Sequence, residues 1–420
     1  MGRRKIGSVL LSGLIIGPIL GSGIIILPPV IYSVAGDMAI LSWAVMMLVS
    51  FLFATVFGWL AMKFPGDAGV ATAVCKAFGI HIKRLMSLYL VCAVCFGPVA
   101  VMLAASDFML AVYDVPISIK VIAYLLLLVC YVILLHDVRL LGKIVLVISS
   151  IAVVILTLGS LVSLIFHRKA ELVTTLCSPT EFGYSLMLVF WVIVGWEVIG
   201  NYGADVQDPS KTIPRATAIS AVTICLVSLV VAAGTQWMDA SDFPHDPMLT
   251  VTALVYPLFG SYSDMVMAVV AGGLCLAAFL MFIGGVSRLV VSMADDGFLP
   301  KVFGTRRTNG APGGGVLLMF CLHSMTFIFV WLDILDLEKL VALADGFLLA
   351  NALLGILAAM NITRHRGMKI VTVILAVFFG IVLLFANPFD LFVIIVMGVW
   401  FGRKQFNENR LELGDRVPCS

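Results

Sequence analysis

The stretch GPILGSGIIILPP, residues 17–29, places glycine and proline inside an apolar run that is long enough to cross a membrane. A bilayer core offers no water to an unpaired backbone N–H or C=O group, and leaving such a group unpaired there costs several kcal/mol. Residues that weaken a helix are therefore expensive at this depth. Either small residues let the first span pack closely against neighbouring helices, or the span is interrupted so that its backbone groups can bind a ligand.

The composition is that of a polytopic membrane protein. Of 420 residues, 62% are hydrophobic and 12% are charged, and the mean hydropathy is +1.13. The net charge of +2 argues against a nucleic-acid partner, and nine cysteines scattered through apolar segments argue against a disulfide framework. The segment MGRRKIG leads directly into the first apolar run and predicts an uncleaved span rather than a signal peptide.

Apolar runs of about 20 residues recur along the whole chain. They predict an all-α polytopic membrane protein with about twelve transmembrane helices. The last two runs are short and could instead form one re-entrant pair. The predicted spans are 8–35, 38–62, 84–113, 117–135, 140–166, 182–203, 212–236, 263–292, 312–332, 339–361, 368–386 and 388–402.

The distribution of basic residues predicts the orientation of these spans. Of 26 Lys and Arg residues, 22 fall in segments on the side of the N-terminus, whereas the opposite loops are acidic, as in WMDASDFPHDP at 237–247. The positive-inside rule then places both termini in the cytoplasm and makes the number of spans even. We therefore expect a multi-pass protein of the cytoplasmic (inner) membrane.

A second weak point lies in the sixth span, where FWVIVGWEVIGNYG at 190–203 contains Gly195 and the ionisable Glu197. An ionisable group inside a bilayer is expensive unless it is paired or faces a cavity. Close packing at small residues could explain one interrupted span. Interruptions at corresponding places in spans one and six instead indicate two inverted halves with a transporter's binding site between them.

Two interrupted helices suit a zwitterionic ligand. Glycines allow unusual dihedral angles and let a ligand approach the main chain. The half-helix that begins after the first break presents free N–H groups and its positive dipole end to a carboxylate, and the carbonyl groups at the second break suit an ammonium group. The two breaks together therefore predict a site for an α-amino acid.

Four motifs follow one another along the chain: GSGIIILPP at 21–29, KFPGDAGVATAVCKAFG at 63–79, FWVIVGWEVIGNYGADVQDPSKTIPRA at 190–216 and SRLVVSMADDGFLPKVF at 287–303. In this order and spacing the chain resembles the amino acid–polyamine–organocation transporter superfamily. Within it, the methionine and branched-chain amino acid exporter branch is the most similar, and the arginine/agmatine exchangers are more distant.

The resemblance implies a fold of five plus five helices in inverted repeat, with spans one and six broken near mid-membrane and two helices appended. It divides the chain into a first repeat (1–167), a second repeat (168–362) and a C-terminal part (363–420). It implies amino acid transport by export, exchange or proton coupling, with no cofactor, no metal and no enzymatic activity. It leaves open whether the protein is a monomer or a homodimer.

The resemblance also implies which residues contact the substrate. The three residues of the first break would hold its carboxylate, and two residues of the second break its ammonium group. Trp191 would be a gate stacked over the substrate, with an interfacial or core tryptophan as the alternative. The residues implied to bind substrate are Ile19, Gly21, Ser22, Gly23, Trp191, Val194, Gly195 and Phe282.

Two acidic residues are candidates for gating or proton coupling. Glu197 would sense protons or couple the gate, or else be a structural acid that is hydrogen-bonded to neighbouring backbone. Asp205 stands where the superfamily usually has glutamate, and either a cytoplasmic gate or a surface salt bridge would explain it.

The chain departs from the superfamily in the fifth span. Some relatives place a lysine there, but this span reads VLVISSIAVV at 145–154, with Ser149 and Ser150, which argues against lysine-based proton coupling. Asp345 and Asp107 are further acidic candidates for function, or are solvated near the interface. His323 would be a proton relay or a satisfied core histidine.

The implied pocket is apolar and aromatic and predicts a neutral, hydrophobic amino acid such as Met, Leu, Ile or Val as the substrate. The sequence gives no clear position to an acid that would neutralise a cationic side chain, which argues against a cationic substrate. A cationic amino acid or amine exchanger is the alternative. A major facilitator is disfavoured because its basic loop and long central loop are missing. A membrane enzyme lacks its motifs, and a channel is the remaining different class.

Overall fold

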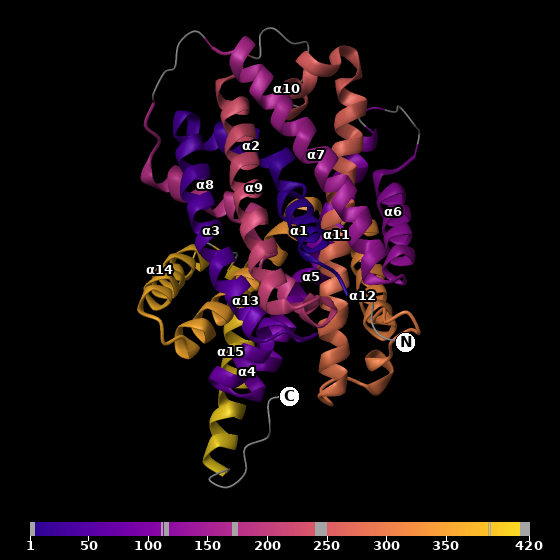
Figure 1. The fold of residues 1–420 in the computed structure, drawn as a ribbon, viewed down its shortest axis with the longest axis vertical. Coiled ribbons are helices and arrows are strands. Elements are labelled where there is room, and N and C mark those ends of the chain that lie inside the picture. Colours follow the sequence, from indigo (N-terminus) through magenta and orange to yellow (C-terminus); the bar gives the residue numbers. More distant parts are fainter. Residues whose placement is uncertain are drawn as a thin grey trace.

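The computed structural model describes residues 5–110, 112, 117–169, 175–239, 250–384, 386 and 388–411. Within these ranges the chain is almost entirely helical and contains no β-strand, and the helices form one bundle (Figure 1). This confirms the predicted all-α fold, in which each regular helix pairs its backbone groups within its own segment. Residues 240–247 of the predicted acidic loop lie outside the described residues, as do residues 1–4 and 412–420 at the two ends.

Each of the twelve predicted spans coincides with one helix or with one interrupted helix. Among the described residues, nine helical segments are long and apolar enough to cross a membrane, and the first of these, Ser8–Lys63, holds two predicted spans. The uninterrupted helices are α3 (Ala39–Lys63), α5 (Ile80–Leu110), α6 (Ile119–Leu134), α7 (Val138–Phe166), α9 (Pro209–Trp237), α11 (Ser263–Asp295), α12 (Gly313–Trp331), α13 (Leu337–Ile362), α14 (Arg366–Leu383) and α15 (Pro388–Leu411).

Spans one and six are interrupted, as predicted. The first consists of α1 (Ser8–Leu20) and α2 (Gly23–Ala35), which are separated by Gly21 and Ser22. The sixth consists of α8 (Pro179–Phe190), a short 3₁₀ turn η2 (Trp191–Ile193), a non-helical stretch and a 3₁₀ helix η3 (Val198–Asp205). A 3₁₀ run of 8 residues is unusually long, and such runs mark hinges or strained segments.

The last two spans are separate helices and not a re-entrant pair. α14 has 18 residues and α15 has 24, so each reaches about 27 Å or more at 1.5 Å per residue. α15 continues nine residues beyond its predicted end at 402. Shorter helices fill the connections: η1 (Gly36–Met38), α4 (Val70–Phe78), α10 (Thr250–Phe259), η6 (Gly260–Tyr262) and η7 (Lys301–Gly304).

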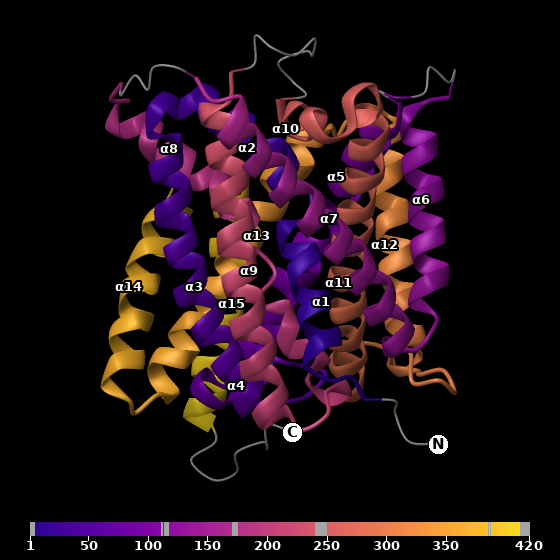
Figure 2. The ribbon, with the colours of Figure 1, turned by 45° about the horizontal axis from the view of Figure 1, so that its top comes forward.

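Contacts between loops show which segments share a face of the bundle. On the face that carries Lys5, called the N-terminal face below, Arg139 Nε donates a hydrogen bond to the Lys5 carbonyl oxygen at 3.0 Å. His81 Nε2 lies 2.8 Å from Glu408 Oε2, so the start of α5 and the end of α15 lie side by side. In Figure 2, α1 begins and α15 ends on the lower side, as an even number of spans requires.

Candidate functional site

The two breaks meet at one cavity inside the bundle. Seven of the eight residues predicted to bind substrate line this cavity, and the eighth, Gly195, lies directly behind its wall. A Cβ atom added to Gly195 would lie 3.1 Å from Ile19 Cγ1 and 3.5 Å from Phe282 Cζ. Walls that the sequence did not identify come from α5, α11 and α13 and include Val94, Gly97, Pro98, Ala278, Phe279 and Leu348.

The first break places the start of a helix at the wall of the cavity. Gly21 adopts φ 43° and ψ −145°, and a Cβ atom there would lie 2.7 Å from the Pro18 carbonyl oxygen. The side chain of Ser22 makes no capping hydrogen bond to α2. Since the N–H groups in the first turn of a helix have no intrahelical acceptor, the start of α2 at Gly23 can bind an anion.

The second break exposes carbonyl groups and is held by a carboxyl group. Val194 is extended, with ψ 137°, and Gly195 follows with φ 125°, a backbone conformation that glycine tolerates and other residues do not. Glu197 is buried, and its Oε2 atom accepts a hydrogen bond from the Gly195 N–H at 3.1 Å. The carbonyl groups at the end of α8 lose their helical partners here and can accept from an ammonium group.

Trp191 separates this cavity from a second one. The second cavity lies on the side away from the N-terminal face, is lined by parts of α2, α5, α8 and α13, and is called the outer vestibule below. Trp191 lines both cavities, and its Nε1 atom donates a hydrogen bond to Ser22 Oγ at 3.3 Å. Gly23 and Gly97 lie against the indole, where added Cβ atoms would be 3.1 Å and 3.7 Å from its carbons. Trp191 therefore lies between two cavities, and its role as a gate stays a prediction.

His323 supports the α5 wall of the cavity. Pro98 has no N–H group, so the Val94 carbonyl one turn earlier loses its helical donor. His323 Nε2 supplies the missing hydrogen bond to Val94 O at 2.7 Å, while its Nδ1 accepts from Tyr131 Oη at 2.7 Å. Both ring nitrogens are occupied by structural partners. His323 is therefore a satisfied core histidine, and the proton-relay interpretation is not supported.

A small pocket beside η3 is lined by Glu197 and by mostly apolar residues. It is lined by Asn201 and Asn351 among others, and both asparagines are buried. Among the described residues, Asn201 Nδ2 and both amide atoms of Asn351 have no hydrogen-bond partner. Buried polar groups of this kind are commonly satisfied by internal water. The sequence did not identify Asn351, because a single amide in an apolar helix carries no motif.

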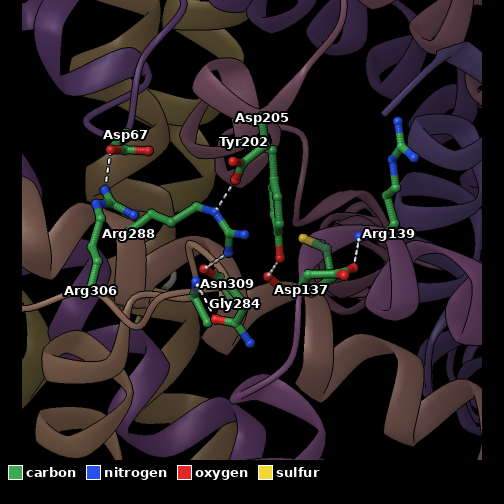
Figure 3. A network of polar contacts seen from close by, with 11 residues as sticks. Asp67, Asp137, Arg139, Tyr202, Asp205, Gly284, Arg288, Arg306 and Asn309 are labelled. Carbon is green, nitrogen blue, oxygen red and sulfur yellow. Dashed lines mark hydrogen bonds and ion pairs between the residues drawn. The ribbon is translucent and has the colours of Figure 1, made fainter. Parts of the chain in front are cut away.

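A network of charged side chains, including a buried ion pair, lies near the N-terminal face (Figure 3). Arg288 Nε lies 2.6 Å from Asp205 Oδ2, and its Nη1 donates to the Gly284 carbonyl oxygen at 2.7 Å. The guanidinium lies over the Tyr202 ring, 4.6 Å from its centroid. The side chains of the pair are only 5% and 6% exposed, so the surface salt bridge considered for Asp205 is wrong. Beside this pair, Arg306 on the α11–α12 connection pairs with Asp67.

The remaining candidates fall in three different places. Ser149 Oγ is buried against α1 and donates to the Val145 carbonyl at 2.6 Å, whereas Ser150 is exposed. Asp107 is exposed near the end of α5. Asp345 lines the outer vestibule together with Trp191. The structure therefore gives this acid a position beside the cavities that the sequence alone did not predict.

Comparison with known proteins gives a consistent result. A family model described as "Amino acid permease" matches residues 6–411. The L-methionine/branched-chain amino acid exporter YjeH of Escherichia coli is 24% identical over 374 residues, covering 87% of each chain. The cadaverine/lysine antiporter of the same organism is 24% identical over 331 residues, covering 75% of this chain and 72% of its own. The branched-chain amino acid permease BcaP of Lactococcus lactis is 27% identical over 133 residues, covering 31% of this chain and 28% of its own.

Proposed function

The chain belongs to the amino acid permease family, and on that premise we propose that it carries neutral, apolar amino acids such as methionine and leucine across the cytoplasmic membrane by alternating access. The observation that carries this proposal is the cavity at the two breaks, where main-chain groups are flanked by apolar side chains. None of the described residues that line it is charged. Burial of an apolar side chain would therefore supply much of the binding free energy.

The proposed binding mode uses each wall of the cavity differently. The substrate carboxylate would accept hydrogen bonds from the first turn of α2 at Gly23 and from the Ser22 hydroxyl. The ammonium group would donate to carbonyl groups around Val194. The side chain would then contact Ile19 and Phe282. Methionine and branched-chain side chains, which the name of the exporter relative specifies, match these apolar contacts.

The proposed transport cycle uses two barriers that lie on opposite sides of the cavity. Trp191 would swing aside to admit substrate from the outer vestibule, and the Asp205–Arg288 pair would separate to open the N-terminal face. We place that face in the cytoplasm because 22 of the 26 basic residues lie on its side. The two breaks support a five-plus-five inverted repeat over 1–167 and 168–362, with 363–420 appended. The proposed role is transport, by export or exchange, and not catalysis.

A second candidate function is the exchange of cationic amino acids or amines. The observation in its favour is Asp345, whose carboxyl group lines the outer vestibule next to Trp191. The cadaverine/lysine antiporter among the relatives points in the same direction. We favour the neutral substrate because Asp345 lies beyond Trp191 and does not line the cavity at the breaks.

Counterflow in proteoliposomes tests the proposed substrate class. Vesicles loaded with unlabelled leucine are expected to accumulate radiolabelled leucine or methionine in a saturable manner. Excess valine or isoleucine should compete, and excess arginine or cadaverine should not. Competition by arginine and cadaverine alone would favour the second candidate. Sustained conductance without saturable counterflow would instead indicate a channel.

Replacing Glu197 with Gln tests proton coupling at the second break. Glutamine preserves the size of the side chain and can still accept the Gly195 N–H, but it cannot exchange a proton. We expect leucine counterflow to persist while its dependence on pH becomes weaker. Glu197→Asp, which keeps a titratable carboxyl group, is the matched comparison. A Gln variant with the pH profile of the unmodified protein would make Glu197 a structural acid.

A further inference from the structure

Two carboxyl groups lie on the contacting helices α13 and α15, beside the outer vestibule. Asp390 lies in the first turn of α15, is 0% exposed, and has no hydrogen-bond partner for either carboxyl oxygen among the described residues. It is packed against Gly346 of α13, where an added Cβ atom would lie 3.1 Å from Asp390 Oδ2. Asp345 directly precedes Gly346 on α13 and lines the outer vestibule. Its Oδ1 atom is also buried without a partner in the described chain.

No described cationic side chain faces this pair. On α13 itself, Asp336 and Lys339 pair with each other at 3.0 Å at the start of the helix, and Asp336 lies roughly 13 Å before Asp345 along it. Tyr89 of α5 reaches α15, where its hydroxyl donates to the Ile394 carbonyl at 2.7 Å. The other described charged groups of the helices around the pair lie at the helix ends: Lys63, Lys76, His81, Lys83, Arg84, Asp107, Glu181, Arg366, Lys369, Arg403, Lys404 and Glu408.

Two adjacent carboxylates without a counter-ion are very costly in an apolar environment. Both the loss of hydration and the mutual repulsion oppose double ionisation, and either is relieved when the pair holds one proton. Asp390 is the better placed of the two to keep the negative charge, because it lies in the first turn of α15, near the positive end of the helix dipole. Asp345 is the better placed to take up the proton, because it lines the outer vestibule.

We propose that Asp345 and Asp390 form a proton-binding site that is loaded from the outer vestibule and is separate from Glu197. Proton exchange at this site changes the charge of the vestibule wall next to Trp191, the residue that separates the vestibule from the substrate cavity. External acid then favours entry of a neutral substrate past an uncharged wall. This coupling to transport rests on the proposed function, whereas proton binding by the pair does not.

The thermal stability of the purified protein as a function of pH tests proton binding without transport. The folded protein would retain a proton that the unfolded chain releases, so its melting temperature should fall by several degrees as the pH is raised from about 5 to about 8. Asp345→Asn removes the repulsion and should flatten this dependence and raise stability at the upper pH. A structural role alone would lower stability at every pH. Asp390→Asn, like Asp345→Asn, should flatten the pH dependence and raise stability at the upper pH.

Asp333→Asn is the matched control, because Asp333 lies on the same side of the bundle but is 83% exposed and pairs with Lys120. It should leave the pH dependence unchanged. In proteoliposomes, Asp345→Asn should keep leucine counterflow but lose most of its response to external pH, with Glu197 intact. An unchanged pH dependence of stability in both Asn variants would overturn the proposal. So would stabilisation by Na⁺ or by cadaverine at constant pH that Asp345→Asn abolishes, because the pair would then bind a metal ion or an amine.

Discussion

Replacing Asp205 with Asn is expected to lower the stability of the folded protein by about 3–5 kcal/mol. The change leaves the buried Arg288 guanidinium without the carboxylate that it contacts directly, since the side chains of this pair are 5% and 6% exposed and lie 2.6 Å apart. A buried charge without its partner keeps its desolvation cost and loses the attraction that offset it. Thermal unfolding in detergent measures this loss. Leucine transport should fall with it, because the N-terminal face would no longer close firmly.

Asp208→Asn is the matched control, since Asp208 lies three residues further along the same connection but is largely solvated and pairs with the exposed Lys211. Exposed pairs contribute about 1 kcal/mol or less, so this variant should unfold close to the unmodified protein. The double variant Asp205→Asn with Arg288→Gln removes both charges and should recover much of the lost stability. Equal stability of the two single variants would argue against a buried ion pair that holds the gate.

The parts of the fold that could be predicted are those with a local signal. Twelve apolar runs, helix-interrupting sequences at corresponding places in two of them and a basic bias on one side are each readable over about 20 residues. The end of α15 was misplaced because Arg403 and Lys404 end the apolar run but not the helix, which continues to Leu411. Long charged side chains at a membrane surface extend into water while the backbone remains helical.

The partners of the predicted residues could not be inferred, because they depend on which helices pack together. Asp205 pairs with a residue 83 positions away, and His323 bonds a carbonyl 229 positions away. Helices in a bilayer are apolar on their lipid side as well as on their packed side, so the sequence gives no amphipathic stripe that identifies the neighbour. For the same reason the sequence did not predict that Asp345 and Asp390 lie on contacting helices.

The residues that line the cavity were more predictable than the residues that hold its walls in place. Ligand contact through the main chain requires glycine or broken helices at particular positions, and these are visible as residue types. Pro98 predicts that some donor is needed, because a proline in a buried helix frees the carbonyl group four residues before it and that group must be satisfied. The sequence does not indicate that His323 is this donor. Which helix supplies this donor is a property of the packed bundle.

Replacing Gly21 or Gly195 with Ala is expected to abolish leucine counterflow. Both residues lie at positive φ, 43° and 125°, where a Cβ atom strains the backbone by about 1–3 kcal/mol. At Gly21 the new atom would also lie 2.7 Å from the Pro18 carbonyl oxygen, and at Gly195 it would lie 3.1 Å from Ile19 Cγ1. The breaks can relieve this strain only by moving, and movement displaces the backbone groups that we propose bind the substrate.

Gly272→Ala distinguishes this effect from a general intolerance of alanine. Gly272 is a buried glycine within α11, and an added Cβ atom would find no atom within 4 Å. Alanine favours a helix over glycine by about 1 kcal/mol, so this variant should transport normally and unfold at an equal or higher temperature. The Gly21 and Gly195 variants should instead stay inserted and folded but lose stabilisation by added leucine, because the defect lies in the binding groups. Leucine stabilisation of Gly21→Ala equal to that of Gly272→Ala would show that the first break does not contact the substrate.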